Sequence, residues 1–155
     1  MQRISNMLKN IIRLELFSVK PEDHLSQVVR IMKDRNVGSV LVCDDTQKPI
    51  GIITDRDLVL RCLAEDKSIH TCNARDVMTP SPRTVKDTDG LYDCIRAMHD
   101  AQARRIPIVD YQGKALGIVS FGDMLSILSK EFTNLIETTT HPLELKKAEK
   151  KGVAA

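Results

Sequence analysis

The sequence predicts a mixed α/β (α+β) fold in which two tandem β-α-β-β-α repeats pack as one pseudo-two-fold globule. The first observation is an internal repeat: residues 19–59 align with residues 85–125 without a gap, with 12 identities in 41 positions. The second is that both copies end on the same phrase, GIITDRDL at 51–58 and GIVSFGDM at 117–124. One repeat of about 50 residues would leave an apolar face uncovered, so the two are expected to pack together.

Each copy is expected to begin with a short extended segment and an amphipathic helix. The extended segments are LFSV at 16–19 and PRTV at 82–85. Apolar residues then recur at helical spacing from Leu25 to Met32 and from Leu91 to Met98. Asp23 and Asp89 precede these helices and are predicted to serve as N-caps or first-turn acids.

Two strands joined in a hairpin and a second helix complete each copy. SVLVC at 39–43 and IPIVD at 106–110 are short runs rich in β-branched residues, followed by turn residues and by PIGIIT or ALGIVS. Helical periodicity resumes near Asp55 and near Gly122. The predicted organisation is a lead-in helix at 1–15, copy 1 at 16–74, copy 2 at 75–131 and a polar tail at 132–155.

Composition narrows the classes of function. The chain of 155 residues carries a net charge of +2 and has three Phe, two Tyr and no Trp. This balance is too mild to indicate nucleic acid, and base-stacking aromatics are scarce. No apolar run is long enough for a transmembrane helix, and the first residues do not resemble a signal peptide. The sequence therefore predicts a cytoplasmic protein without a membrane partner.

The cysteines do not form a disulfide framework or a strong metal motif. Cys43 and Cys94 fall within apolar patterns and are expected to pack as small hydrophobic residues. Cys62, His70 and Cys72 are close in sequence but supply only three ligands, short of a structural zinc site. We therefore predict no metal site.

The repeated phrase carries the chemistry for holding a nucleotide. Thr54 and Ser120 stand where a strand meets a helix, and Asp57 and Asp123 lie one turn further on. Helix N-termini suit phosphate, and a carboxylate accepts two hydrogen bonds from a vicinal diol such as ribose. The alternative is that the same four residues only cap their helices.

Two copies of G-h-h-[ST]-x-x-D, with RDVMTPSPRTV at 75–85 between them, resemble a tandem pair of cystathionine-β-synthase (CBS) domains, a Bateman module. The resemblance covers residues 8–131. It departs from the family pattern at residues 11–14, where copy 1 has IIRL in place of a V-M-T-P segment. Arg13 stands where copy 2 has Thr79, and Leu16 where it has Pro82. The ligand contacts expected from that segment of copy 1 are therefore in question.

The resemblance implies a regulatory ligand that contains adenosine: AMP, ADP, ATP, S-adenosylmethionine or NAD. It implies that Asp57 with Thr54, and Asp123 with Ser120, bind the ribose and phosphate. The residues implied for the adenine cleft lie where the chain enters the first and second strands: Ser18, Val19, Ser39, Val40, Thr84, Val85, Ile106 and Pro107.

Arginines near these clefts are candidate phosphate ligands. Arg104 and Arg105 precede the strand at 106–110, where copy 1 has Gly38 and Ser39, so the two clefts are expected to differ. Arg56 lies within the repeated phrase of copy 1. Each could instead be a solvated surface residue.

No motif of catalysis is present, so the protein is predicted to be a binding module and not an enzyme. A stand-alone pair is expected to work by binding a regulated partner protein, whose identity is unknown, or by self-association. The resemblance implies a homodimer formed through the helices of 91–98 and 124–128. The alternatives are a ligand-free structural or oligomerisation module and a weak nucleic-acid-binding protein that uses Arg104, Arg105 and the lysine-rich tail.

Overall fold

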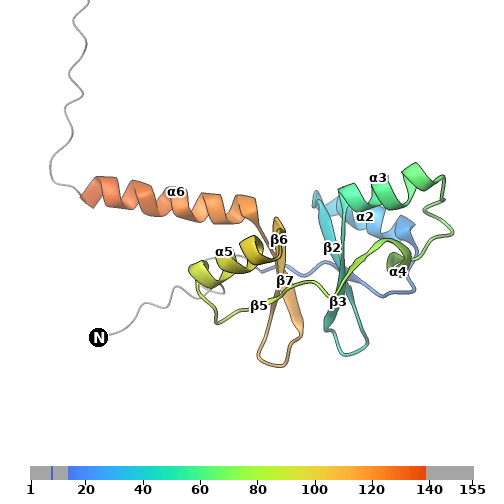
Figure 1. The fold of residues 1–155 in the computed structure, drawn as a ribbon, viewed down its shortest axis with the longest axis horizontal. Coiled ribbons are helices and arrows are strands. Elements are labelled where there is room, and N and C mark those ends of the chain that lie inside the picture. The colour runs from blue at the N-terminus through green and yellow to red at the C-terminus, as the bar shows by residue number, and fades with distance from the viewer. Residues whose placement is uncertain (1–7, 9–13, 139–155) are drawn as a thin grey trace, which may run out of the picture.

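The computed structural model describes Leu8 and residues 14–138 (Figure 1). Most of the predicted lead-in helix and the end of the predicted tail lie outside the described residues. Within the described part of the chain, no helix is both long enough and apolar enough to cross a membrane.

Both copies have the predicted order of elements. Copy 1 consists of β1 (Ser18–Val19), α2 (Leu25–Arg35), β2 (Ser39–Cys43), β3 (Pro49–Thr54) and α3 (Asp55–Arg61), followed by a 3-10 turn (Leu63–Glu65) and α4 (Ala74–Val77). The linker strand β4 (Thr79–Pro80) leads to copy 2, which consists of β5 (Val85–Lys86), α5 (Leu91–Asp100), β6 (Arg105–Val109), β7 (Ala115–Ser120) and α6 (Phe121–Thr138). Helix α6 continues into the segment that the sequence assigned to the tail.

The two copies form two sheets with matching registers. One sheet has the order β1-β2-β3-β4 and the other β5-β6-β7. In the hairpin of copy 1, the first residue of β2, Ser39, lies opposite the last residue of β3, Thr54. In the hairpin of copy 2, Arg105 at the start of β6 lies opposite Ser120 at the end of β7. This register places the entry of one strand beside the strand-to-helix junction that carries the repeated phrase.

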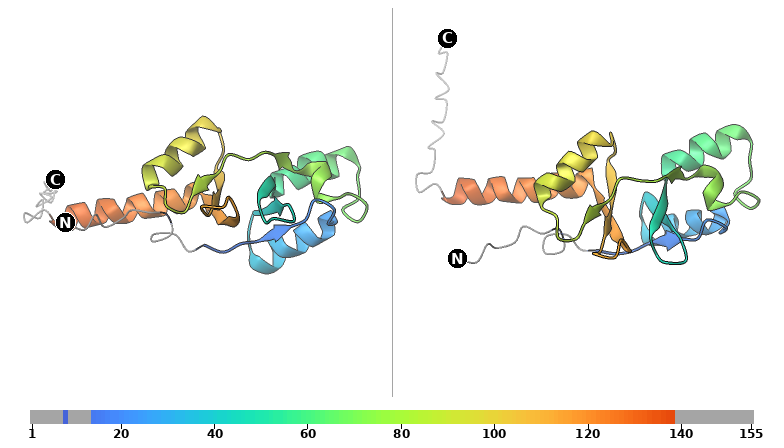
Figure 2. Two further views of the ribbon diagram at one scale, coloured as in Figure 1. Left: turned by 90° about the horizontal axis from the view of Figure 1, so that it is seen from below. Right: turned by 60° about the horizontal axis from the view of Figure 1, so that its bottom comes forward.

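The sheets face each other at the centre, and the helices lie on the outside (Figures 1 and 2). Leu41 and Ile52 of copy 1 pack against Ala115 and Ile118 of copy 2 between the sheets. Under the helices, each copy has its own aliphatic core, which contains Val28 and Ile53 in copy 1 and Ile106 and Val119 in copy 2. The far end of α6 projects beyond the rest of the described chain.

Each copy is entered by a segment that first lies against the other copy. Strand β4, in the linker to copy 2, pairs with β3 of copy 1. The segment before β1 passes over β7 of copy 2, where a Cβ on Gly117 would lie 3.1 Å from the carbonyl oxygen of Glu15. Gly51, the counterpart of Gly117 in copy 1, lies directly under Met78. Gly117 thus makes room for the backbone of the crossing segment, and Gly51 makes room for the side chain of Met78.

Two local expectations were wrong. The N-caps of α2 and α5 are His24 and Gly90, and not the preceding aspartates. Asp23 and Asp89 instead hold the turn after the first strand, because they accept hydrogen bonds from the backbone N–H groups of Lys20 (2.7 Å) and Lys86 (2.8 Å). A carboxylate that closes a turn accepts hydrogen bonds from backbone N–H groups, as a helix cap does. Here those N–H groups lie in the turn before the helix and not in its first turn.

The cysteines are free thiols. Cys43 and Cys94 are buried, and burial raises the pKa of both, that of Cys94 to about 11. Cys62 and Cys72 contribute to the core of copy 1, while His70 is exposed. Among the described residues, no three metal-ligating side chains come together.

The close approach at Gly117 predicts the effect of a single methyl group. Gly117→Ala should lower the free energy of unfolding by about 1–3 kcal/mol, because the new Cβ forces the backbone at Glu15 away from β7. Urea denaturation of the full chain measures this. Gly122→Ala, whose Cβ would meet only the hydroxyl of Ser120 at 3.6 Å, is the control and should be neutral or slightly stabilising. Equal stability of the two variants would contradict the role of the crossing segment.

Candidate functional site

The strand-to-helix junction of copy 1 is closed by a reciprocal capping box. The carboxylate of Asp57 accepts hydrogen bonds from the backbone N–H (2.8 Å) and the hydroxyl (2.7 Å) of Thr54. The hydroxyl oxygen accepts in turn from the backbone N–H of Asp57 at 3.3 Å. Arg61, one turn further along α3, lies 3.5 Å from the other carboxylate oxygen. The Asp57 side chain is only 14% exposed, and both of its oxygens have partners within the protein. The hydrogen-bonding capacity of this carboxylate is therefore largely used inside copy 1.

The junction of copy 2 has the same capping box but a more open carboxylate. Asp123 accepts hydrogen bonds from the backbone N–H and the hydroxyl of Ser120, both at 2.7 Å. Asp123 is exposed, and its second carboxylate oxygen has no hydrogen bond or ion pair with any residue that the structure describes. This oxygen is therefore available to an external donor.

Asp123 and Ser120 line a cleft of about 390 Å³ between the two copies, which we call cleft A. Copy 1 contributes the end of α2, the entry to β2 and the chain that leads into β1, whereas copy 2 contributes β6, β7 and the start of α6. The other residues that line it are Glu15, Phe17, Asn36, Val37, Gly38, Ser39, Arg105 and Ile118. Cleft A thus combines apolar walls, exposed backbone, a carboxylate and a guanidinium.

A second cleft of about 400 Å³, cleft B, lies at the pseudo-equivalent place. It is lined by Ile52, Thr79, Pro80, Ser81, Pro82, Arg83, Asp100, Ala101, Ala103, Arg105 and Ile106. Several of these residues are the counterparts of cleft A residues in the 66-residue repeat. Arg83 corresponds to Phe17, and Ala103 corresponds to Val37. Thr54 and Asp57, the counterparts of Ser120 and Asp123, do not line cleft B.

The arginines are placed unequally. Arg105 lines both clefts, and with Arg104 it also lines a smaller pocket of about 290 Å³ at the pseudo-dyad, which we call the dyad pocket. Asp55, Ser120, Phe121 and Gly122 complete this pocket. Arg56, by contrast, is exposed on α3 and lines none of these three cavities. The structure therefore brings two of the three candidate phosphate ligands together.

The residues assigned to the adenine cleft are dispersed. Ser39 lines cleft A and Ile106 lines cleft B. Ser18 is half-buried in β1, and Val19, Val40 and Pro107 are buried. At these strand entries the aliphatic side chains turn into the core, so only their backbone could face a ligand.

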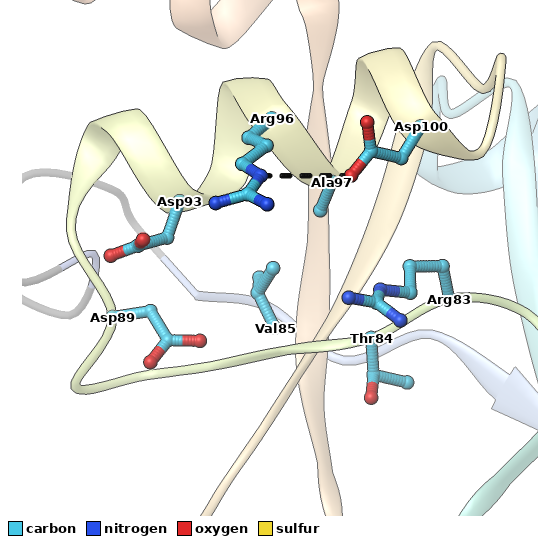
Figure 3. A pocket seen from close by; sticks show the side chains of 8 residues that line it. All are labelled: Arg83, Thr84, Val85, Asp89, Asp93, Arg96, Ala97 and Asp100. Carbon is cyan, nitrogen blue, oxygen red and sulfur yellow. Dashed lines mark ion pairs between the residues drawn. The ribbon is translucent and has the colours of Figure 1, made fainter.

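Thr84 and Val85 line a different cavity, of about 420 Å³, between β5 and α5 (Figure 3). Its walls mix Arg83 and Arg96 with three aspartates, Asp89, Asp93 and Asp100. Two of the aspartates accept hydrogen bonds from backbone N–H groups, and Asp100 pairs with Arg96 at 3.8 Å. Because its lining carries two arginines against three aspartates, a formal excess of one negative charge, this cavity does not favour an anion.

Several lining residues escaped the sequence reasoning, above all Glu15, Phe17 and Ile118 in cleft A. These residues carry no motif, and they reach the cleft because the lead-in segment crosses to the other copy. The 66-residue offset could have found part of cleft B, because Ser81 and Arg83 are the counterparts of Glu15 and Phe17. It could not show that each cleft combines residues of both copies.

Comparison with known proteins agrees with this architecture. The CBS domain family model matches residues 7–63 and 74–130. YlbB of Bacillus subtilis is 35% identical over 118 residues, which are 76% of this chain and 78% of that protein. The MK0525 protein of Methanopyrus kandleri is 32% identical over 117 residues, which are 76% of this chain but 60% of that longer protein.

Solved structures share the fold. CBSX2 of Arabidopsis thaliana superimposes with a TM-score of 0.69 at 26% identity, covering 83% of this chain and 97% of that one. The CBS domain pair of the protein MJ0100 superimposes with a TM-score of 0.71 at 20% identity, covering 81% and 97%. The two family matches coincide with the two packed repeats and with their strand-to-helix junctions, and the chain therefore belongs to the CBS domain family as a tandem CBS pair.

Proposed function

We propose that this chain is a regulatory module that binds an adenosine-containing ligand in cleft A and transmits its occupancy to a partner protein. The observation that carries the proposal is the open carboxylate of Asp123 at the edge of a cleft built by both copies. An exposed carboxylate oxygen beside a hydroxyl matches the two adjacent hydroxyls of ribose, which donate hydrogen bonds.

The rest of cleft A suits the other parts of such a ligand. Phe17, Val37 and Ile118 supply apolar walls for an adenine ring, and the backbone between α2 and β2 can read its polar edge. Arg105 and the dyad pocket lie beside Ser120, at the start of α6, where a helix N-terminus and guanidinium groups favour a phosphate. Adenine, ribose and phosphate thus find complementary groups in sequence across the cleft.

Structures of other CBS pairs support this class of ligand. One structure of CBSX2 is a complex with AMP, at 24% identity and a TM-score of 0.68 over 80% of this chain and 97% of that one. The structure of the MJ0100 pair holds 5′-methylthioadenosine and S-adenosylmethionine. We therefore propose AMP, ADP, ATP or S-adenosylmethionine as the regulatory ligand, with binding and not catalysis as the activity.

The position of the cleft suggests how occupancy could be transmitted. Because cleft A is lined by both copies, a bound ligand would favour the relative orientation of the copies that fits it best. Such a change would move α6, whose first turn carries Asp123, relative to copy 1. The proposed output is therefore a shift of the outer helices, where a partner can bind.

We also propose that the chain forms a homodimer through α5 and α6. A groove of about 400 Å³ between these helices is lined mainly by apolar side chains, among them Ile95, Met98, Phe121, Leu125 and Leu128. Along α6 the seam of Phe121, Leu125 and Leu128 continues through Phe132 and Leu135, at alternating spacings of four and three residues. Such a seam pairs best with an identical seam, so a second copy of this chain is the partner that fits it.

Ligand binding and its location can be measured together. Isothermal titration of the full chain with AMP, ATP and S-adenosylmethionine should show binding of at least one of them. Asp123→Ala should weaken that binding about tenfold or more, because the ribose loses a charged acceptor. Asp76→Ala is a matched control, since Asp76 closes the capping box of α4 away from the clefts and accepts from Asn73 at 2.8 Å.

Circular dichroism must show that the variants remain folded. An unaltered affinity in Asp123→Ala would contradict the assignment of the ribose to Asp123. If none of the three ligands bound the folded wild-type chain, the capping boxes would be structural and the ligand proposal would fail.

The homodimer predicts a sharp contrast between neighbouring residues of α6. Leu125→Glu should convert the dimer into a monomer in light scattering after gel filtration, because a charge is placed in the apolar seam. Leu125 is 51% exposed, so the substitution should leave the fold intact. Ser126→Glu, at an exposed position that does not line the groove, should remain dimeric. A wild-type monomer, or a dimeric Leu125→Glu, would contradict the interface.

A further inference from the structure

Arg105 occupies a singular place among the cationic side chains that the structure describes. It lines cleft A, cleft B and the dyad pocket. Its side chain is half-buried, yet it forms no ion pair or side-chain hydrogen bond with any described residue. Loss of hydration without a protein partner makes a guanidinium a strong site for an anion.

The pseudo-symmetry does not supply a second such group. A shift of 66 residues relates Arg105 to Ser39 and Arg104 to Gly38. The Arg105 guanidinium reaches across the pseudo-dyad and lies over Gly38, where a Cβ would be only 2.6 Å from its Nη2 atom. Glycine at position 38 thus leaves the space that the side chain of copy 2 fills. Two clefts therefore share one central guanidinium.

The charge around Arg105 also suits one phosphate group better than two. The dyad pocket holds Arg104 and Arg105 together with the carboxylate of Asp55, whose Oδ2 lies 3.3 Å from the same hypothetical Cβ on Gly38. The start of α6 adds a partial positive charge. Two arginines offset by one aspartate leave a small net positive charge, which a single phosphate neutralises.

We propose that Arg105 is a phosphate ligand common to both clefts, so that phosphorylated adenine nucleotides bind to clefts A and B anticooperatively. This inference rests on the proposed function, because it requires an adenosine-type ligand in cleft A, and it extends that function to a second such ligand in cleft B. A phosphate in cleft A engages the guanidinium and places a negative charge beside the route by which a second phosphate would approach it from cleft B. The coupling is reciprocal, so either nucleotide weakens the other. Adenosine itself, without a phosphate, is not subject to this competition.

The test isolates each cleft in the full chain. Asp123→Ala disables cleft A and leaves cleft B, and Ala101→Trp, at an exposed position that lines cleft B but not cleft A, fills cleft B and leaves cleft A. ADP and adenosine are titrated calorimetrically into each variant, with and without Arg105→Gln. Shared use of Arg105 predicts that Arg105→Gln weakens ADP about tenfold or more in both backgrounds and leaves the affinity for adenosine unchanged. Arg30→Gln, which removes an exposed arginine of α2 outside the clefts, is the matched control.

The outcomes separate the two proposals. An effect of Arg105→Gln in only one background, in neither background, or equally on adenosine overturns the shared ligand, as does an absence of ADP binding in Asp123→Ala. In each of these cases binding of adenosine to the wild-type chain would leave the proposed function standing. If neither adenosine nor ADP bound the folded wild-type chain, the shared ligand would fail. The proposed function would fail with it only if AMP, ATP and S-adenosylmethionine did not bind either.

Discussion

The arrangement of the two repeats depends on a single packing constraint, the close contact of each entering segment with the last strand of the other copy. Gly117 carries no side chain, so the backbone before β1 can lie directly on β7, and Gly51 likewise leaves room for the side chain of Met78, which precedes the strand β4 that pairs with β3. This contact fixes the two sheets face to face, with Leu41, Ile52 and Ala115 between them. It also makes each cleft a product of both copies. The site therefore exists only when the whole tandem is folded.

The two strand-to-helix junctions share the same capping chemistry but differ in the partners of their carboxylates. Both hydroxyl–carboxylate pairs satisfy the first N–H groups of a helix, which any strand-to-helix connection requires. In copy 1, Arg61 draws the remaining carboxylate oxygen of Asp57 into an ion pair. In copy 2, residue 127 stands at the position equivalent to Arg61 and is isoleucine, so the remaining oxygen of Asp123 stays open. One apolar residue in α6 thereby distinguishes a structural junction from a candidate ligand site.

Sequence reasoning predicted what is local or repeated. The alternation of elements, the hairpins, the start of α3 at Asp55 and the two capping pairs follow from periodicity and from the 66-residue repeat. It failed where a side chain satisfies a backbone group in a neighbouring turn, as at Asp23 and Asp89. At strand entries such as Val40 and Thr84 the assignment to the adenine cleft stays a prediction, because the direction of the side chain depends on which face of the sheet is buried. The position of Arg105 across the pseudo-dyad depends on packing between the copies, which no local pattern contains.

The glycine at position 38 bears on how the contact between the two copies can be formed. Its hypothetical Cβ would lie 2.6 Å from the Nη2 atom of Arg105, so a side chain at position 38 would displace that guanidinium from its present place. A homodimer of a single repeat has identical halves, so both halves would carry the arginines. Their guanidinium groups would then repel each other within the same space. A covalently linked tandem can keep arginine in one half and glycine in the other. Covalent duplication thus permits an asymmetric centre in a molecule built from two similar halves.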